Sequence, residues 1–181
     1  MKVLLLNGSP RKGNTLAALE SIAEGIKENL NAEVELLDVT KYNVAGCLAC
    51  DYCGTHKGKC VNQKDDGQML ADKMEVADVI IFGTPVYWWG ISAQLKSVLD
   101  RMYMKKFEAE KKNKKVGIVA VGADSLENEE YELISRQFKC ICEFVGWDLV
   151  IDKSISAYAK TDLVNNKEVV DDLKKVWENI K

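Results

Sequence analysis

Short runs of consecutive apolar residues recur along the chain, separated by longer segments in which apolar and polar residues are mixed. Four of these runs are rich in β-branched residues and lie at positions 3–6, 34–37, 79–82 and 116–121. Apolar runs of this length are typical of strands buried on both faces of a parallel sheet. A fifth run, at 149–155, places Val150, Ile151 and Ile155 among polar residues. That pattern favours an edge strand.

Segments of helical periodicity alternate with these runs. Apolar residues recur three or four positions apart at 16–30, 95–102, 131–145 and 169–180. A shorter helix is expected at 67–76, with Asp65 or Asp66 as its N-cap. Strict alternation of strands and helices predicts an α/β fold: a three-layer α/β/α sandwich around a doubly wound, five-stranded parallel sheet. Five strands favour the order 2-1-3-4-5.

Length and composition indicate one ordinary globular domain. We expect residues 1–181 to form this domain, with a cysteine-rich insert at about 43–64. A net charge of -3 gives no reason to expect a nucleic acid or an anionic membrane as partner. The first apolar run has four residues and ends in turn formers, so we expect neither a signal peptide nor a membrane span and predict a cytoplasmic protein. The lysine-rich residues 105–115 are interpreted as a solvated helix end and loop.

The loop after the first strand has the composition of an anion-binding site. Its sequence, NGSPRKGNT, occupies positions 7–15 and leads directly into the first helix. Ser9 and Thr15 supply hydroxyl groups, Asn14 can cap the helix, and Arg11 and Lys12 add positive charge. The glycines do not have the order of a nucleoside triphosphate loop or of a dinucleotide loop, so a phosphomonoester fits better. The alternative is a plain turn without a ligand.

The loop after the third strand carries three successive aromatic residues, Tyr87, Trp88 and Trp89. Ligands of doubly wound sheets bind beyond the carboxyl ends of the strands. Flat aromatic surfaces at that edge suit a flat heteroaromatic ligand, and Pro85 and Gly90 let the chain turn sharply. The alternatives are that a tryptophan packs under the loop or that the patch is an oligomer contact. Ser92, by contrast, is predicted only to cap the following helix.

Four of the six cysteines lie within fourteen residues, as Cys47, Cys50, Cys53 and Cys60. Their spacing, C-x2-C-x2-C-x6-C, begins like the ferredoxin run but has a longer last gap and no following proline. All four can therefore converge on one site. Because reducing compartments disfavour disulfides, metal binding or redox activity is expected. Zinc on four thiolates is one metal candidate, though not the favoured one. The alternative is that the thiols are free or linked in disulfides.

The remaining candidates for metal binding are interpreted as structural or inert. Cys140 and Cys142 are two positions apart on a predicted helix, so they point to nearly opposite sides and cannot share a metal. Packing is the simpler role for at least one of them. His56 is the only histidine in the chain, and a lone exposed histidine is more often inert than catalytic.

Three features together resemble the flavodoxin-like NAD(P)H-dependent FMN reductase family. They are GSPRKGNT after the first strand, TPVYWWGISAQLKSVLDR from the third strand into its helix, and the cysteine-rich insert. The insert indicates the iron-sulfur flavoprotein subgroup. The resemblance is specific over residues 1–101 and continues afterwards mainly as element order.

This resemblance implies a flavodoxin-like fold that binds FMN, often as a homodimer or homotetramer with the flavin ring near a subunit interface. By position in the motifs, the phosphate would be held by Ser9, Arg11, Asn14 and Thr15, with Lys12 nearby. The ribityl chain and ring would be lined by Pro85, Val86, Tyr87, Trp88, Trp89 and Gly90. A third flavin loop would comprise Gly122, Ala123 and Asp124. A 4Fe-4S cluster is implied on Cys47, Cys50, Cys53 and Cys60, at the edge where the flavin lies, within electron-transfer reach of it directly or across a subunit interface.

Two classes of redox function and one binding function are consistent with these residues. The first is an enzyme in which NAD(P)H reduces the flavin and the flavin reduces a small acceptor such as a quinone, free flavin, nitro compound or oxygen. The second is an electron-transfer iron-sulfur flavoprotein that exchanges electrons with ferredoxin-like partners. The third is a non-catalytic phosphometabolite-binding module. No catalytic residue is expected, because the flavin itself carries the chemistry of hydride transfer.

Overall fold

The computed structural model describes residues 1–105 and 113–181. The lysine-rich segment interpreted above as a solvated loop therefore lies largely outside the described residues. The strands run as follows: β1 Lys2–Asn7, β2 Glu33–Asp38, β3 Val79–Pro85, β4 Lys115–Gly122 and β5 Asp148–Ser156. The α-helices are α1 Asn14–Asn29, α2 Tyr52–Thr55, α3 Gly67–Val76, α4 Ala93–Arg101, α6 Glu129–Val145, α7 Asp162–Asn165 and α8 Lys167–Lys174. Short 3-10 turns occupy Val39–Lys41, Met102–Lys105 and Val176–Asn179.

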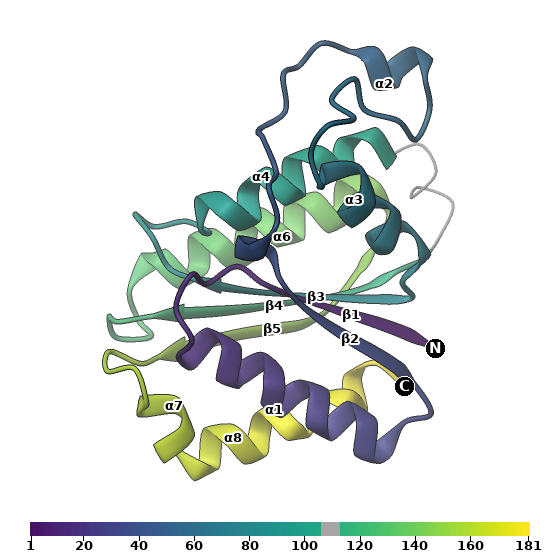
Figure 1. The fold of residues 1–181 in the computed structure, drawn as a ribbon. Helices are drawn as coiled ribbons and strands as arrows, with labels where there is room; N and C mark the ends of the chain where they lie inside the picture. Colours follow the sequence, from purple (N-terminus) through teal and green to yellow (C-terminus); the bar gives the residue numbers. More distant parts are fainter. Residues whose placement is uncertain (106–112) are drawn as a thin grey trace.

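The five strands form one parallel sheet in the order β2-β1-β3-β4-β5, which confirms the predicted topology. Figure 1 shows α1, α7 and α8 covering one face of the sheet and α3, α4 and α6 covering the other. Every residue of β3 is buried, as expected for a central strand with helices on both sides. The resulting three layers are the predicted sandwich.

The two outer strands differ from the inner ones in burial. Polar and partly buried residues are interspersed along β5, which confirms the prediction of an edge strand. The prediction that residues 34–37 are buried on both faces is wrong, because none of the residues of β2 is fully buried. The strand order explains this result: β2 pairs only with β1, so its other side has no neighbouring strand.

The alternation of side chains along the central strands divides the core into two parts. Leu4, Leu6 and Phe82 pack with α3, α4 and α6, whereas Leu5 and Ile81 pack with α1 and α8. The last predicted helix is split in two: α8 ends at Lys174, and a 3-10 turn follows at Val176–Asn179. None of the helices within residues 1–105 and 113–181 is long and apolar enough to span a membrane.

Candidate functional site

The loop from β1 into α1 lies against the start of α4 at the carboxyl edge of the sheet. The Gly8 amide donates a hydrogen bond of 2.8 Å to the carbonyl of Gly83 at the end of β3. A Cβ atom on Gly8 would lie 2.8 Å from Cβ of Leu95 and 2.9 Å from Oγ of Ser92. Glycine is therefore required here because the two loops approach so closely.

Ser92 joins the two loops as well as capping α4. Its hydroxyl accepts a hydrogen bond from the Leu95 amide at 3.3 Å, which confirms the predicted N-cap. The same hydroxyl donates to the carbonyl of Gly8 at 2.8 Å. The backbone amide of Ser92 donates to the hydroxyl of Thr84. The loops after β1 and β3 are thus held in one fixed arrangement.

These loops and the one after β4 enclose a cavity of about 200 Å³. Its wall contains Ser9, Arg11, Gly13, Asn14, Thr15, Pro85, Val86, Tyr87, Val121, Gly122, Ala123, Ala157 and Tyr158. Most of the predicted phosphate and flavin residues therefore come together at one place. The exceptions, which do not line this cavity, are Lys12, Trp88, Trp89, Gly90 and Asp124.

One end of the cavity has the properties of an anion site. Helix α1 begins after Gly13, which supplies no side-chain cap, and Asn14 and Thr15 of its first turn lie in the wall. Amide groups of the first turn and the helix dipole favour negative charge at this position. The Ser9 hydroxyl exchanges hydrogen bonds with the backbone of Arg11, which fixes the loop that carries the guanidinium.

Asn14 has a structural role in addition to the predicted one. Its side-chain amide donates to the carbonyl of Ala159 at 2.7 Å, and its side-chain oxygen accepts from the amide of Leu163 at 3.2 Å. These bonds fix the side chain in the cavity wall and leave its second N–H available to a ligand, so the phosphate contact of Asn14 stays a prediction.

The loop after β4 is packed tightly against the start of α6. A Cβ atom on Gly122 would collide with side-chain oxygens of Glu130 and Tyr131, so the chain can pass here only as glycine. Burial and the neighbouring Glu130 raise the pKa of Tyr131 to about 12. The phenol donates to the carbonyl of Asp124 at 2.9 Å. The Asp124 carboxylate accepts from the amide of Ser125 and the side chain of Asn128, so it serves this turn rather than the cavity.

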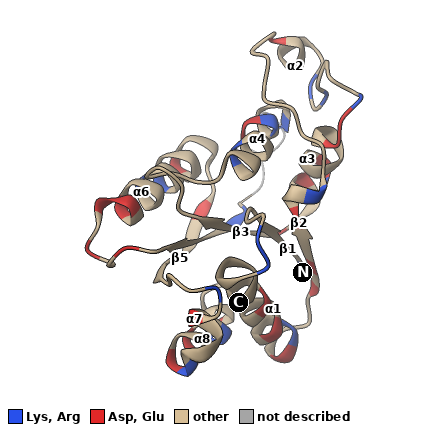
Figure 2. Cartoon of the chain, turned by 60° about the vertical axis from the view of Figure 1, so that its left-hand side comes forward, with Lys and Arg blue, Asp and Glu red and all other residues tan. Residues whose placement is uncertain are grey.

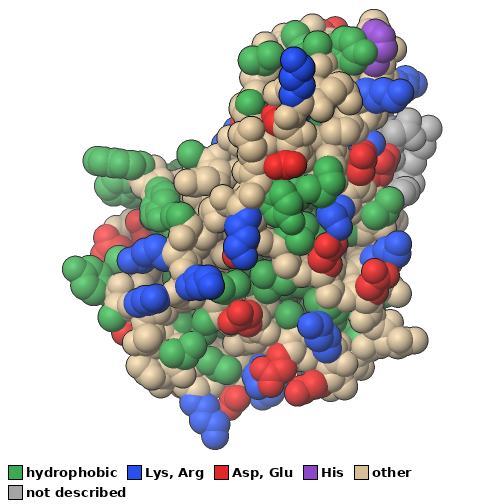
Figure 3. All heavy atoms as spheres, in the orientation of Figure 1, with side chains coloured by type: hydrophobic (Ala, Val, Ile, Leu, Met, Phe, Trp, Pro, Cys, Tyr) green, Lys and Arg blue, Asp and Glu red, His purple; other side chains and the backbone are tan. Residues whose placement is uncertain are grey.

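Trp88 and Trp89 form the tip of a two-residue turn. The Tyr87 amide donates to the Gly90 carbonyl at 2.9 Å, and the Gly90 amide donates back to Tyr87 at 3.1 Å. Trp88 and Trp89 have φ of 49° and 58°, values that are costly for bulky residues. Their relative exposures are 92% and 50%, which excludes packing of Trp88 under the loop. Figure 3 shows hydrophobic side chains projecting from the left side of the molecule, where Figure 1 places the loops at the carboxyl edge.

The cysteine-rich insert lies far from this cavity in the fold. It runs across the end of α4 at the top of the molecule in Figure 1, where the Gly58 amide donates to the carbonyl of Met104. Arg101, at the end of α4, is only 2% exposed and holds both ends of the insert. Its guanidinium donates to the carbonyls of Ala45 and Asn62 and to both carboxylate oxygens of Asp65.

Asp65 combines two functions at the end of the insert. Its carboxylate pairs with Arg101 at 2.6 Å and also accepts a hydrogen bond from the Gly67 amide, so it caps α3 although Asp66 occupies the N-cap position. Burial alone would raise the pKa of Asp65. The hydrogen bonds from Arg101, Ala45 and Gly67 outweigh this effect and hold the pKa below its ordinary value.

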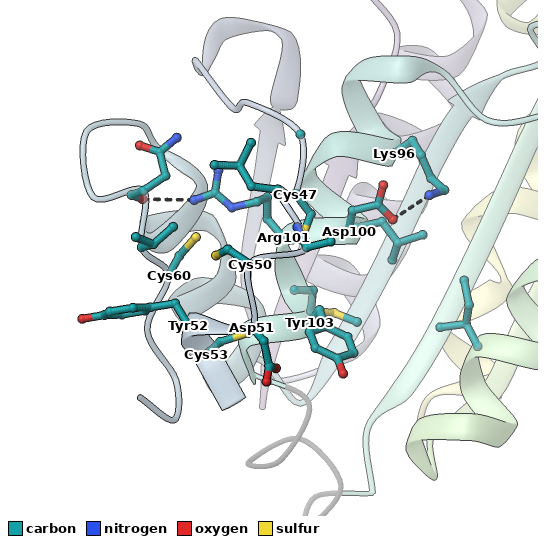
Figure 4. A pocket seen from close by; sticks show the side chains of 18 of the residues that line it. Cys47, Cys50, Asp51, Tyr52, Cys53, Cys60, Lys96, Asp100, Arg101 and Tyr103 are labelled. Atoms are coloured by element: carbon teal, nitrogen blue, oxygen red, sulfur yellow. Dashed lines mark hydrogen bonds and ion pairs between the residues drawn. The ribbon is translucent and has the colours of Figure 1, made fainter. Parts of the chain in front are cut away.

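A second cavity, of about 710 Å³, lies between the insert, α4 and α6. Cys47, Cys50, Cys53 and Cys60 line it from the insert, and Cys140 lines it from α6. Figure 4 shows the four insert side chains in this cavity, beside Arg101 and the ion pair of Lys96 and Asp100. All of these thiols are free.

The four insert cysteines are suitable donors for an iron-sulfur cluster, but their side chains are not arranged around one site. Free thiols on a short, largely irregular segment are a suitable donor set for iron and sulfide. Among the described residues, however, no three His, Cys, Asp or Glu side chains are arranged to hold a metal ion. The predicted convergence is therefore not present in this arrangement of the insert. Burial raises the pKa of the Cys53 thiol, and the charges of Cys47, Asp51 and Cys60 raise it further.

In a single chain the insert and the predicted flavin residues line different cavities. The wall of the 710 Å³ cavity shares no residue with that of the 200 Å³ cavity. The reason is that α4 runs back from the carboxyl edge of the sheet, and Arg101 draws the insert to the far end of that helix. Electron-transfer reach to the flavin, directly or across a subunit interface, stays a prediction.

Cys142 and Cys140 behave as expected of two residues on opposite sides of a helix. Cys142 is buried in the core, which confirms the prediction of packing, and burial raises the pKa of its thiol to about 11. Cys140 is exposed at the edge of the larger cavity.

Sequence reasoning missed Ala157, Tyr158 and Arg101. Ala157 and Tyr158 follow the edge strand β5, and the loop there has no glycine-rich or basic motif. An aromatic residue directly after a strand was the one signal in the sequence that could have indicated a ligand-binding loop. The role of Arg101 had no signal in the sequence, because the segments that it joins are far apart along the chain.

The fold and the cavity at the carboxyl edge define this chain as a flavodoxin-like α/β protein. Residues 1–138 match the family of the NADPH-dependent FMN reductases. The match covers more than half of the chain, and the chain belongs to this family.

Curated relatives include iron-sulfur flavoproteins from archaea. One from Archaeoglobus fulgidus is 42% identical over 106 residues, which cover 59% of this chain and 51% of that protein. Another, from Methanocaldococcus jannaschii, is 37% identical over 131 residues, which cover 72% of this chain and 66% of that protein. The aligned segments thus span about half to two thirds of these relatives.

Solved structures show the same fold at low sequence identity. An FMN-dependent NADH-azoreductase from Bacillus anthracis, in complex with FMN, superposes with a TM-score of 0.71 at 13% identity and covers 99% of both chains. RosB, with a bound flavin intermediate, superposes with a TM-score of 0.76 at 14% identity, over 100% of this chain and 77% of that chain. At these identities the likeness establishes the fold alone.

Proposed function

We propose that this protein is an FMN-dependent oxidoreductase that uses NAD(P)H to reduce a small acceptor such as a quinone, a free flavin, a nitro compound or oxygen. The observation that carries this proposal is the convergence of the loops after β1, β3 and β4 on one cavity with the N-terminus of α1 in its wall. Membership of the FMN reductase family supports it.

The residues of the cavity fit the two ends of FMN. The Arg11 guanidinium, the hydroxyl of Thr15 and the first-turn amides of α1 are suited to the phosphate. The ribityl chain and the near side of the ring are suited to other residues of the same wall, Val86, Tyr87, Gly122 and Ala123. When bound, FMN supplies the hydride and electron chemistry, and the protein positions the cofactor and limits the access of water. No side chain is proposed as a catalytic acid or base.

Incomplete enclosure of the ring supports a homodimer or homotetramer. A cavity of about 200 Å³ is smaller than the roughly 300–1,000 Å³ that encloses a drug-sized ligand. The flavin ring would therefore project past Tyr87, beside the exposed Trp88 and Trp89. A second subunit would cover these aromatic surfaces. We also propose that residues 1–181 act as one domain and that the protein is cytoplasmic.

The second candidate function is electron transfer between FMN and a 4Fe-4S cluster held by Cys47, Cys50, Cys53 and Cys60, with a ferredoxin-like partner. Four free thiols on one segment favour it, as does similarity to proteins named iron-sulfur flavoproteins. The two functions share the FMN site and differ in the electron donor.

Anaerobic spectroscopy and steady-state kinetics separate the candidates. We expect protein loaded with FMN to show flavin absorbance and to oxidise NADPH or NADH in the presence of a quinone. Failure with both nucleotides, together with reduction by ferredoxin and the presence of iron and sulfide, would favour the electron carrier. A colourless protein that does not quench FMN fluorescence would contradict both and leave the phosphometabolite-binding module.

A further inference from the structure

A fourth loop, at 157–161 between β5 and α7, contributes to the wall of the 200 Å³ cavity. Ala157 and Tyr158 line this cavity together with Arg11 and Gly13 of the loop after β1. The Ala157 amide donates to the carbonyl of Gly122 at 2.8 Å, which extends the pairing of β5 with β4. Tyr158 then leaves the sheet with a relative exposure of 81%, at the mouth of the cavity.

This loop is fastened to the N-terminus of α1. The buried side chain of Asn14 bonds the carbonyl of Ala159 and the amide of Leu163, one on each side of the turn into α7. The Asp162 carboxylate accepts from the Ala159 amide at 2.6 Å and closes the turn. The loop therefore has a fixed position relative to the first turn of α1.

The same arrangement brings the Lys160 side chain beside Gly13 of the cavity wall, although Lys160 itself does not line the cavity. A Cβ atom on Gly13 would lie 3.3 Å from Cγ of Lys160, so glycine leaves room for the lysine side chain to cross the loop. Lys160 has no acidic partner among the residues that the structure describes. Figure 2 shows basic residues both on the loop from β1 into α1 and on the approach to α7.

We propose that the loop at 157–161 recognises the phosphate of the flavin. Lys160 supplies a second positive charge to the phosphate besides Arg11, and Tyr158 shields it from water. Asn14 is a positioning residue that holds the loop in place. The consequence is selectivity for the phosphorylated flavin, FMN, over riboflavin. This inference rests on the proposed FMN site and adds a specificity determinant to it.

The test compares the dissociation constants of FMN and riboflavin, measured by quenching of flavin fluorescence in purified protein. In Lys160→Met we expect FMN to bind about tenfold more weakly because one charge-assisted contact is lost. Riboflavin, which has no phosphate, should bind within about twofold of wild type. Lys160→Arg should retain FMN affinity. The matched control is Lys167→Met on α8, an exposed lysine that, unlike Lys160, does not approach Gly13, and it should change neither constant.

A double-mutant cycle tests the positioning role of Asn14. Asn14→Ala should weaken FMN more than riboflavin, and Lys160→Met should add little once Asn14 is absent, because the loop no longer holds the lysine in place. Additive effects would show that Asn14 acts only on stability. Equal weakening of FMN and riboflavin in Lys160→Met, or no change in either, would overturn the inference. Failure of the wild-type protein to bind FMN would instead overturn the proposed function.

Discussion

Single residues determine how the insert is attached to the sheet domain, and Arg101 is the clearest example. Its guanidinium forms hydrogen bonds to both ends of the insert and an ion pair with Asp65, whose side chain is only 4% exposed. Both charged groups are withdrawn from water, so each depends on the other for compensation of its lost hydration. An ion pair between two solvent-exposed side chains would contribute far less to the free energy of unfolding.

Replacement of this arginine should destabilise the protein strongly. Arg101→Met leaves the Asp65 carboxylate buried without its partner, which we expect to lower the free energy of unfolding by about 3–5 kcal/mol. Urea denaturation followed by circular dichroism measures this change. Arg136→Met is the matched control, because Arg136 is exposed on α6, and it should change stability by less than about 0.5 kcal/mol. Equal stability of the two variants would contradict the role given to Arg101.

The same pair predicts a dependence of stability on pH. The pKa of Asp65 lies below its ordinary value of 3.8, so the native state binds the proton less readily than the unfolded chain. The stabilisation is therefore complete above about pH 4 and is lost as the pH falls toward the native pKa. Acid titration of the unfolding free energy should be flatter in Asp65→Asn than in wild type below about pH 4. Parallel curves would show that other carboxylates account for the acid sensitivity.

Among the elements, the turn between β3 and α4 has the most strained backbone at the carboxyl edge of the sheet. Two-residue turns in which both central residues have positive φ favour Asn-Gly, yet Trp88 and Trp89 occupy these positions. The hydrogen bonds between Tyr87 and Gly90 keep the turn closed despite the cost. Exposed aromatic rings in such a conformation indicate that the turn serves binding or assembly rather than the stability of the isolated chain.

Relief of this backbone strain should stabilise the chain. The double substitution Trp88→Asn and Trp89→Gly should raise the free energy of unfolding of the FMN-free protein by about 1–2 kcal/mol, because both new residues accept positive φ at lower cost. Chemical denaturation of the double and single variants measures the effect at each position. A loss of stability would mean that the tryptophan rings make stabilising contacts that outweigh the strain.

For the whole molecule, the fold separates a sheet domain from an insert that contributes little to its core. No fully buried apolar residue of the two core clusters lies between Val39 and Leu70 in sequence. The carbonyls of Ala45 and Asn62 both accept hydrogen bonds from Arg101, so the two ends of the insert lie close together. A short linker can therefore join them.

Removal of the insert should leave a folded flavoprotein. A variant in which residues 47–60 are replaced by a short Gly-Ser linker should still unfold cooperatively and bind FMN within about threefold of wild type, since the wall of the proposed flavin cavity contains none of these residues. Size-exclusion chromatography and fluorescence titration measure both properties, and iron and sulfide should be absent. A variant with the four cysteines changed to serine separates the loss of thiols from the loss of the segment. Failure of both variants to bind FMN would show that the insert supports the flavin site.

Much of the fold follows from the order of local patterns. The apolar runs and periodic segments indicated a parallel sheet with the order 2-1-3-4-5, and that order is present because right-handed crossovers leave few alternatives. The predicted phosphate loop could be proposed from sequence because all its polar groups are contiguous, and most of them line one cavity. Asn14 was harder to assign, because its hydrogen bonds join it to residues more than a hundred positions away.

Local patterns in the chain were enough to predict the class of fold, the polar loop after the first strand and the thiols available to a cluster, because each depends on neighbours within about one helix or loop. Tertiary contacts were needed to show that the insert lies at the far end of α4, that the loop after β5 lines the 200 Å³ cavity, and that Trp88 projects into solvent. These features depend on contacts such as Arg101 with Ala45 and Asn14 with Ala159. Such contacts join segments that the periodicity of the chain does not relate, because periodicity describes each element and not the packing of one element on another.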